Sequence, residues 1–444
     1  MKRRVLIGCL LVLAVTRAAA ATDAATVDAV RQVLLYGIDS QVTDALQTLS
    51  SAWDPAYVPP LVAILTDKRS AALQTSVLDI FRNQSVKDGE AAAKGFLDAW
   101  QDDDSALVVA AVRYLTSLHS AGVAAALGPV VDSPDSALSS AAITALGSVG
   151  TSDSTTLLLA KLASADFPDA RKPDIILALG SLKDKAAVDA LMAIVKNTDE
   201  DQIRRLYAAD ALGKIGDPKA LPVLRDMFAE KEALVRQYAA SALARFGLEE
   251  VFDSLIQALR DEDAKVREAS ANALARSLTP AQAAAAVPVL SFKAENDPVA
   301  QVRIASVKAL GEIGGDAAMK KLLAIYSSNA RPLDSRETAL TELTAKALSQ
   351  SMDAIRKVID DEWKMYDPRT LESTAKVLST THSADLKAIL VHLLDSTDPV
   401  TRSYGARGIA LNGFTDMKDR LVKMSTADPN PGTRREAELA AAKL

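Results

Sequence analysis

Apolar positions along the chain recur at helical spacing in short runs. In one run, Val302, Ala305, Leu310 and Ile313 fall on a single helical face, and Gly314 follows them. A face of this period predicts an amphipathic helix. Glycine commonly ends a helix because it reaches the left-handed backbone region without a Cβ clash. The run therefore predicts one helix with a defined end.

The run itself repeats along the chain with the shape V-R-x-x-A-x-x-A-L-x-x-I-G. Strong copies begin near Arg204, Val235 and Val266, and residues 187–314 hold the clearest ones. The residue that matches Leu310 in each copy serves as an anchor, and the anchors are spaced about 33 residues apart, as in helical solenoids. The thirteen anchors are Leu46, Ile80, Leu115, Leu146, Leu179, Leu212, Leu243, Leu274, Leu310, Leu343, Leu378, Ile409 and Ala441.

Each period has room for two helices, of which the run above is the second. An Asp-Pro pair such as Asp217-Pro218 opens the first helix, where proline is tolerated because its missing N–H needs no partner. A further proline recurs within the predicted first helices and predicts a bend there. The fold class predicted for residues 22–444 is an all-α solenoid of about 12 or 13 helix pairs. The recurring prolines are Pro59, Pro60, Pro129, Pro222 and Pro288.

These copies resemble the HEAT repeat family, in particular the short HEAT-like repeats also found in phycobilin lyases. The resemblance rests on the V-R-x-x-A-x-x-A-L-G-x-I-G core and extends over residues 40–444. It implies a right-handed α-α superhelix, with second helices on the inner face and first helices on the outer face. It does not imply one function, because the same solenoid serves many.

The first 21 residues have the three-part layout of a secretory signal peptide. A basic start is followed by the apolar run 5–15 and by small residues up to Ala21. We therefore expect an exported protein of the periplasm, the cell envelope or the medium, without a transmembrane segment once the signal is removed. Cys9 resembles a lipoprotein cysteine, but the apolar run continues past it, so lipidation is disfavoured.

Composition narrows the chemistry that the mature chain could perform. Cys9 is the only cysteine, so a chain without its signal has no disulfide, thiolate nucleophile or cysteine metal site. The net charge of −6 includes four positive charges in the first 21 residues, which leaves the remainder near −10. Because nucleic-acid binding needs a basic stripe, we expect no nucleic-acid partner.

Motifs for catalysis or metal binding are missing from the sequence. The three histidines, His119, His382 and His392, have no second ligand at metal-binding spacing. Dinuclear-iron hydroxylases built on HEAT repeats use His-Glu pairs, and no His-Glu dipeptide occurs here. No G-x-S-x-G or phosphate-binding loop occurs either. We therefore expect no catalytic residues, no metal and no cofactor.

An arginine occupies one repeat position in many copies, and an acid usually lies a few residues before it. Such a row could capture anions, but one acid for each arginine favours a structural ladder between repeats. In that interpretation the acid both caps the second helix and pairs with a neighbouring arginine. The expected ladder comprises Arg205, Arg236, Arg267, Arg303, Arg336 and Arg402, with Arg434 at the same position. The acids are Glu232, Asp263, Asp297, Asp334, Asp398 and Asp428.

The variable positions of the second helices are candidates for an interaction surface. Tyrosines also share one repeat position, at Tyr207, Tyr238 and Tyr404, where a filler between repeats is favoured over a ligand strip because the neighbouring positions are apolar. The candidate interaction surface comprises Gln237, Arg245, Glu268, Asn272, Arg276, Lys308 and Glu312.

Three functions remain open on the sequence. The leading hypothesis is a non-enzymatic scaffold that binds a protein or peptide along the second helices. A ligand-binding, cofactor-binding or lyase-like protein could instead use scattered tyrosines and carboxylates. A structural protein could self-associate through the C-terminal repeat, because residues 435–444 lack a polar capping repeat.

Overall fold

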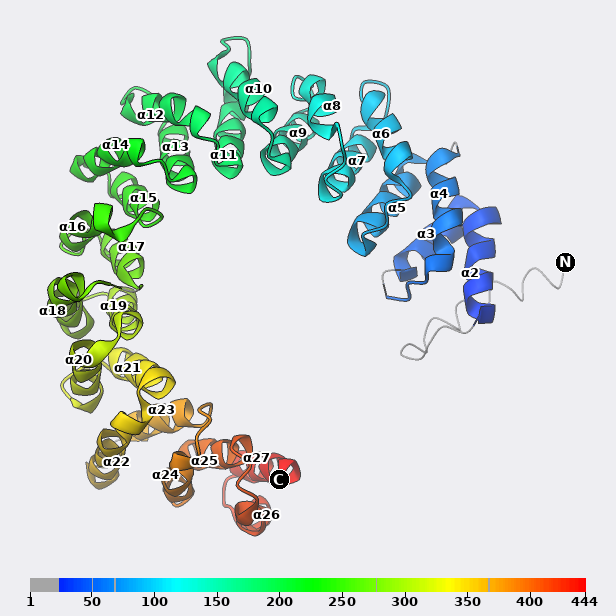
Figure 1. Cartoon of the computed structure of the whole chain (residues 1–444). Coiled ribbons are helices and arrows are strands. Elements are labelled where there is room, and N and C mark those ends of the chain that lie inside the picture. The colour runs from blue at the N-terminus through cyan, green and yellow to red at the C-terminus, as the bar shows by residue number, and fades with distance from the viewer. Residues whose placement is uncertain (1–23, 50, 68, 277, 366–367) are drawn as a thin grey trace. The chain divides into compact units, whose positions relative to one another are not determined.

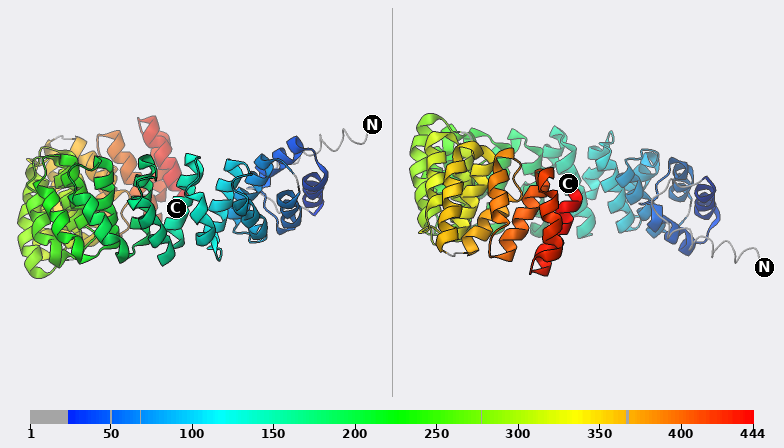
Figure 2. Two further views of the ribbon diagram at one scale, coloured as in Figure 1. Left: turned by 90° about the horizontal axis from the view of Figure 1, so that it is seen from above. Right: turned by 90° about the horizontal axis from the view of Figure 1, so that it is seen from below.

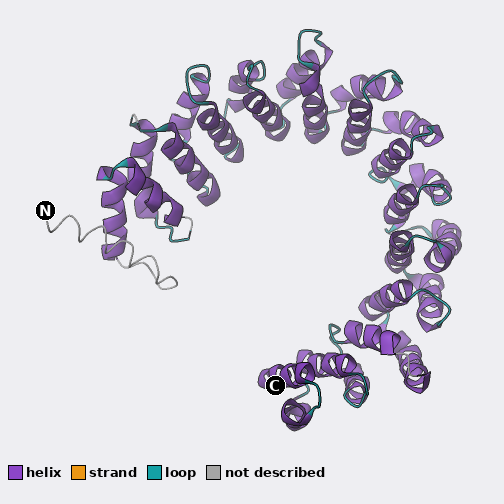
Figure 3. Ribbon diagram, turned by 180° about the vertical axis from the view of Figure 1, so that it is seen from behind, coloured by secondary structure: helices purple, strands orange, loops and turns teal. Residues whose placement is uncertain are grey.

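The computed structural model describes residues 24–49, 51–67, 69–276, 278–365 and 368–444. Within these ranges the chain forms 26 α-helices and no strand (Figure 3). The predicted all-α HEAT-like solenoid is therefore confirmed, and so is the expected number of helix pairs. The predicted signal peptide, residues 1–21 with Cys9, lies outside the described residues.

The chain divides into two compact units, unit 1 (Met1–Val223) and unit 2 (Leu224–Leu444). In each unit, first and second helices alternate and form two layers, which we call the first-helix layer and the second-helix layer (Figure 1). Consecutive second helices pack on one another, and each first helix packs on a second helix. Each repeat therefore contacts mainly its neighbours within a unit.

Unit 1 contains six helix pairs. Its first helices are α2 (Ala24–Tyr36), α4 (Val58–Thr66), α6 (Glu90–Asp98), α8 (Val123–Val130), α10 (Ser152–Ala163) and α12 (Val188–Lys196). Its second helices are α3 (Asp39–Leu49), α5 (Ala71–Gln84), α7 (Ser105–Ser117), α9 (Ser136–Val149), α11 (Lys172–Leu182) and α13 (Gln202–Ile215). The short helix α14 (Leu221–Asp226) spans the division between the units.

Unit 2 continues the alternation, and Figure 2 shows its helices side by side in chain order. Its first helices are α16 (Leu248–Ala258), α18 (Pro280–Asn296), α20 (Gly315–Ser327), α22 (Leu348–Met365), α24 (Lys387–Leu393) and α26 (Lys418–Ala427). Its second helices are α15 (Ala233–Leu243), α17 (Ala264–Leu274), α19 (Ala300–Ile313), α21 (Leu333–Lys346), α23 (Pro368–Leu378), α25 (Pro399–Leu411) and α27 (Pro431–Lys443).

The core of each unit lies between the two layers. All thirteen anchor residues predicted from the repeat are buried, and Leu146, Leu212 and Leu310 have no exposed surface. Burying a leucine side chain stabilises a fold by about 1.5–3 kcal/mol. The anchors therefore supply a regular series of core contacts, one for each helix pair.

Short polar residues and glycines set the ends of the second helices. The side chains of Asp104, Asp135 and Asp263 accept hydrogen bonds from the first backbone N–H groups of α7, α9 and α17. At the other end, Gly150 and Gly216 cap α9 and α13 in the left-handed conformation, as the repeat pattern predicts.

The recurring prolines occupy two different places. Pro129 and Pro288 lie inside α8 and α18. Pro59 and Pro60 instead stand in the first turn of α4, after a 3-10 turn over Pro55–Tyr57, where proline removes no helical hydrogen bond. Pro222 stands likewise in the first turn of α14, after a 3-10 turn over Pro218–Ala220. The expected interior position is therefore wrong for these three prolines, because the 3-10 turn delays the start of the α-helix.

Candidate interaction surface

The second helices α15 and α17 present polar side chains opposite their buried faces. In α15, Val235, Ala239 and Leu243 are buried, whereas Ser241 is exposed and Gln237 is half-buried. The spacing of four residues between Gln237 and Ser241 places both on one helical face. The same face of α17 carries Lys265, Glu268 and Asn272.

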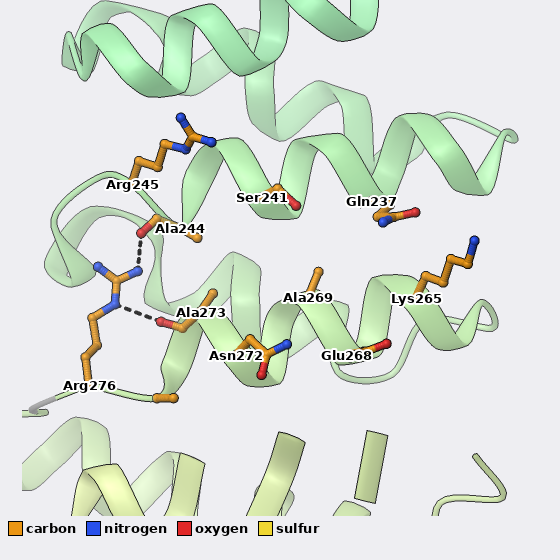
Figure 4. Close-up of a pocket in the computed structure, with 11 residues that line it drawn as sticks. Gln237, Ser241, Ala244, Arg245, Lys265, Glu268, Ala269, Asn272, Ala273 and Arg276 are labelled. Atoms are coloured by element: carbon orange, nitrogen blue, oxygen red, sulfur yellow. Dashed lines mark hydrogen bonds between the residues drawn. The ribbon is translucent and has the colours of Figure 1, made fainter. Parts of the chain in front are cut away.

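A groove of about 680 Å³ lies between these two faces in unit 2 (Figure 4). Four alanines, which we call its floor, and seven polar residues, which we call its walls, line the groove. The floor residues are Ala244, Ala269, Ala273 and Ala275. The wall residues are Gln237, Ser241, Arg245, Lys265, Glu268, Asn272 and Arg276.

Five polar side chains of the groove make no hydrogen bond or ion pair with any other described residue. They are the side chains of Gln237, Ser241, Lys265, Glu268 and Asn272. Polar side chains at a surface bond to water where they have no protein partner. These five are therefore available to a ligand without breaking an internal bond.

Arg276 is committed to the backbone, although it lines the groove. Its Nε donates to the carbonyl of Ala273 at 2.7 Å, its Nη1 donates to the carbonyl of Phe246 at 3.2 Å, and its Nη2 donates to the carbonyl of Ala244. Burial lowers the pKa of the Arg276 guanidinium. The Arg276 side chain thus links the residues that follow α15 to the end of α17.

The other predicted surface residues are not all brought together. Arg245 is exposed at the end of the groove opposite Lys265 (Figure 4). Lys308 and Glu312 lie on α19, outside the groove lining. Lys308 is exposed, whereas Glu312 forms an ion pair with Lys346 of α21 at 2.7 Å. A binding role for the predicted set stays a prediction.

The arginines of unit 2 make a recurring set of bonds across the seams between repeats. Arg267 of α17 donates from Nε and Nη2 to the carboxylate of Asp297 at 2.8 and 2.9 Å. Its Nη1 donates to the carbonyls of Asp261 and Glu262 in the connection before its own helix. One guanidinium thus joins its own connection to that of the next repeat.

The same two-sided arrangement occurs in three further copies. Each arginine pairs with an acid of the next repeat through Nε and Nη2, and each Nη1 donates to two carbonyls of the arginine's own connection. The pairs are Arg236 with Asp261, Arg303 with Asp334, and Arg402 with Asp428.

Capping and pairing are performed by different acids, not by the single acid that the sequence suggested. Asp263 caps α17, while Asp261, two residues earlier, pairs with Arg236 and accepts the N–H of Asp263. Asp398 likewise caps α25. Asp297 accepts the N–H of Val299 in addition to its arginine. The pairing acid therefore also fixes the residue that begins the helix.

Three arginines of the row have different environments. Arg336 donates to the carbonyl of Tyr326, to Thr370 and, at 3.2 Å, to Glu362 near the end of α22. Arg205 donates to the carbonyl of Val195 at 3.2 Å. Arg434 donates to the carbonyls of Asp428 and Pro429.

The buried Arg267–Asp297 pair is held in its ionised form. Burial raises the pKa of Asp297, but the hydrogen bonds from Arg267 and from the backbone of Val299 outweigh burial and lower this pKa overall. The Asp297 carboxylate in turn raises the pKa of Arg267. Breaking one partner of such a pair leaves a buried charge without compensation.

In unit 1, α13 carries Arg205 at the repeat position of these arginines and α9 carries the uncharged Ser139, while Gln74 of α5 lies one residue after that position. Gln74 of α5 donates from Nε2 to the carbonyls of Leu65 and Asp67, and Ser139 of α9 donates from Oγ to the carbonyl of Val131. These bonds resemble those of the arginine Nη1 atoms, because they also end on the preceding connection. Neither side chain reaches an acid of the next repeat.

The three tyrosines of the shared position are half-buried in the second-helix layer. Arg407 lies 5.5 Å from the ring centre of Tyr404. In the described part of the chain, no group of three histidine, cysteine, aspartate or glutamate side chains could hold a metal ion. No helix among the described residues is both long and apolar enough to cross a membrane.

Sequence reasoning missed three residues that shape these arrangements. Ser241 and Lys265 line the groove, and their helical spacing from Gln237 and Glu268 was a usable signal. Asp261 pairs with Arg236, and only its place two residues before the cap distinguished it from Asp263.

Comparison with curated proteins gives short local similarities. The chain is 38% identical over 61 residues to the deoxyhypusine hydroxylase of Gallus gallus, which covers 14% of this chain and 20% of that protein. It is 39% identical over 62 residues to deoxyhypusine hydroxylase-B of Oryza sativa subsp. japonica, with the same coverage. The chain thus spans about a fifth of the length of these relatives.

Solved structures give a likeness of fold. The chain is similar to Kap121p bound to Pho4p, with a TM-score of 0.48 and 14% identity, over 94% of this chain and 53% of Kap121p. A second Kap121p structure, bound to Nup53p, gives a TM-score of 0.47. The chain spans about half the length of Kap121p.

The family assignment rests on a match that covers nearly the whole repeat region. Residues 34–439 match the spirochaete HEAT repeat protein family. This range includes twelve of the thirteen anchors, the arginine row and the groove between α15 and α17. The chain therefore belongs to the spirochaete HEAT repeat protein family.

Proposed function

We propose that this chain is a non-enzymatic scaffold that binds a protein partner at the groove between α15 and α17. The observation that carries the proposal is the group of five polar side chains that face this groove without a partner among the described residues. A partner could bind them by displacing water, without first breaking internal bonds.

Other seams of the second-helix layer in unit 2 support the choice of this groove. Across the seam between α19 and α21, Lys346 is bonded to both Glu312 and Glu342. Across the seam between α21 and α23, Glu337 is bonded to Lys376 and Ser373. Polar side chains in these seams already have partners, so a ligand would have to displace them.

The proposed place of action is the cell envelope, outside the cytoplasm. It rests on the signal-peptide layout of residues 1–21. A fusion of residues 1–30 to alkaline phosphatase, an enzyme that is active only after export, should be active in a bacterial host. An inactive fusion that is retained in the cytoplasm would contradict export.

A photocrosslinking amino acid at position 241 tests the binding proposal. Ser241 is exposed and lies in the groove, so the substitution should not disturb the core. We expect one protein to crosslink in stoichiometric amounts from an envelope extract, and to be lost when Asn272→Arg fills the groove. A crosslinker at position 320, on the exposed face of α20, is the matched control.

Two outcomes would contradict the scaffold proposal. Equal crosslinking from positions 241 and 320 would show that the groove is not the contact. Purified protein that carries only a small molecule, and crosslinks to no protein, would favour the ligand-binding alternative.

A further inference from the structure

We infer that the groove between α15 and α17 holds a short extended segment of its partner by the segment's backbone. This inference rests on the proposed function and specifies the chemistry of the ligand. It follows from the lining of the groove, its length and the absence of large apolar side chains on its floor.

The walls of the groove match the groups that an extended backbone offers. The side chains of Gln237 and Asn272 each carry an amide, which can donate and accept hydrogen bonds at the same time. Ser241 adds a hydroxyl with the same capacity. An extended chain presents N–H and C=O groups along its edges that need partners. Because Gln237 and Asn272 come from facing helices, both edges of one segment can be bonded (Figure 4).

The length of the groove sets the length of the segment. Helix α15 has 11 residues, and α17 beside it also has 11. At a rise of about 1.5 Å per residue, each helix is roughly 16 Å long. An extended strand rises about 3.3 Å per residue, so about five residues of a partner lie along the groove.

The floor of the groove excludes the main alternative, a partner helix. A helix bonds its own backbone internally, and it docks through an apolar stripe into an apolar groove. The floor offers only the methyl groups of four alanines. Such a floor gives little apolar burial to large side chains, whereas it lets a backbone approach closely.

Charged side chains lie at both ends of the groove, Lys265 and Glu268 at one end and Arg245 at the other. Lys265 and Glu268 lie three residues apart on α17 and carry opposite signs, so they favour no net charge in the partner. Recognition through amides and a hydroxyl depends weakly on salt, because these groups carry no formal charge. We therefore expect binding that tolerates changes of the partner's sequence and of ionic strength.

The test uses synthetic peptides with the chain from Thr22 to Leu444. The probe is a fluorescein-labelled pool of seven-residue peptides composed of Gly, Ala, Ser and Thr, blocked at both ends. The control probe is the same pool with methylated backbone nitrogens, which cannot donate. Fluorescence anisotropy should detect binding of the first pool, and methylation should weaken it at least ~10-fold through the loss of several hydrogen bonds.

Matched variants test whether the hydrogen bonds to the peptide backbone form in the groove. Gln237→Ala and Asn272→Ala should each weaken the binding of the unmethylated pool roughly 5- to 10-fold, since one hydrogen bond contributes about 1 kcal/mol. Lys320→Ala, on α20 outside the groove, should leave binding unchanged. Unfolding midpoints of all variants should equal that of the parent, because none of the three side chains is fully buried.

The outcomes separate this inference from the proposed function. Equal binding of the methylated pool, or binding insensitive to both Gln237→Ala and Asn272→Ala, would overturn recognition of the backbone. Failure of both pools, together with a specific protein crosslink at position 241, would overturn the extended segment and keep the scaffold. Failure of the pools and of the crosslink would overturn both.

Discussion

Unit 1 and unit 2 differ in how side chains at or beside one repeat position bond the connections between helices. In unit 2 an arginine there bonds its own connection and also an acid of the next repeat, as Arg267 does with Asp297. In unit 1, Gln74 and Ser139 bond the preceding connection only. The comparison shows that the bond to the connection is the common requirement, and that the charged bond across the seam is an addition to it.

Unit 1 holds neighbouring second helices together by close approach. A Cβ atom on Gly147 of α9 would lie 2.9 Å from the Cα of Ala178, and one on Gly180 of α11 would lie 2.8 Å from the Cα of Ala211. Across the α9–α11 seam, Arg171 also donates to the carbonyls of Ser133 and Pro134. At the α9–α11 seam, small residues and backbone acceptors thus take the place of an arginine–acid pair.

The largest expected effect is that of breaking one pair of unit 2. Arg267→Ala removes both guanidinium hydrogen bonds to the Asp297 side chain, which is 1% exposed, and leaves Lys293, 3.6 Å away, as its remaining cation. We expect a loss of about 3–5 kcal/mol of unfolding free energy. Urea unfolding followed by circular dichroism measures it. Arg435→Ala, at an exposed position, should change stability by less than about 0.5 kcal/mol. Equal effects of the two changes would show that the pair is dispensable.

The next largest effect should come from separating two helices of unit 1. Gly180→Ala forces a Cβ against the backbone of Ala211, and such overpacking costs about 1–3 kcal/mol. Gly95→Ala, where the added Cβ meets no atom within 4 Å, should instead stabilise α6 by about 0.5–1 kcal/mol. Thermal unfolding distinguishes the two. If both changes stabilised the chain, the close approach would not be needed.

A smaller loss is expected from the uncharged donor of unit 1. Ser139→Ala removes the 2.7 Å bond to the carbonyl of Val131 and should cost about 1 kcal/mol. The control is Ser148→Ala on the exposed face of the same helix, which should be nearly neutral. A loss as large as that of Arg267→Ala would erase the contrast between the units.

Acid should act on the pairs of unit 2 and sharpen the comparison further. The folded pKa of Asp297 lies below its unfolded value, so its contribution is present above about pH 3.9, the unfolded pKa of Asp, and is lost as pH falls through the folded pKa. The stability of the parent relative to the double variant Arg267→Met with Asp297→Leu should therefore fall below that pH. If the stability of the parent relative to the double variant rose as pH fell, the lowered pKa of Asp297 would be contradicted.

The repeat pattern was sufficient to predict the fold and the place of its core. The anchors, spaced about 33 residues apart, are buried because each copy reports its own helical face, a local property of the sequence. The arginine positions were equally visible. Their acidic partners were harder to predict. Asp261 and Asp263 lie two residues apart, and only the conformation of the connection decides that Asp261 pairs with Arg236 and Asp263 caps α17.

The groove was only partly predictable for a related reason. Gln237, Glu268 and Asn272 follow from helical spacing, but their lack of partners depends on residues about 30 positions away. Arg276 looked like a surface residue, yet it lies against the carbonyls after α15. Glu312 looked equally available, but Lys346 reaches it from the next second helix. Pairing across a seam is set by two repeats together, and one helix does not reveal it.

The reach of each arginine across a single seam has a consequence for how such a chain could change length. Joining Val266 directly to Arg303 would delete residues 267–302 and place Arg303 after the cap Asp263, at the spacing that Arg267 has now. Arg303 would then find the carbonyls of Asp261 and Glu262, and it would keep Asp334 as its acid. Asp261 would keep Arg236. Genetic loss of this repeat would thus leave Arg236 and Arg303 each with an acid, so deletion in steps of one repeat is built into the chemistry of these connections.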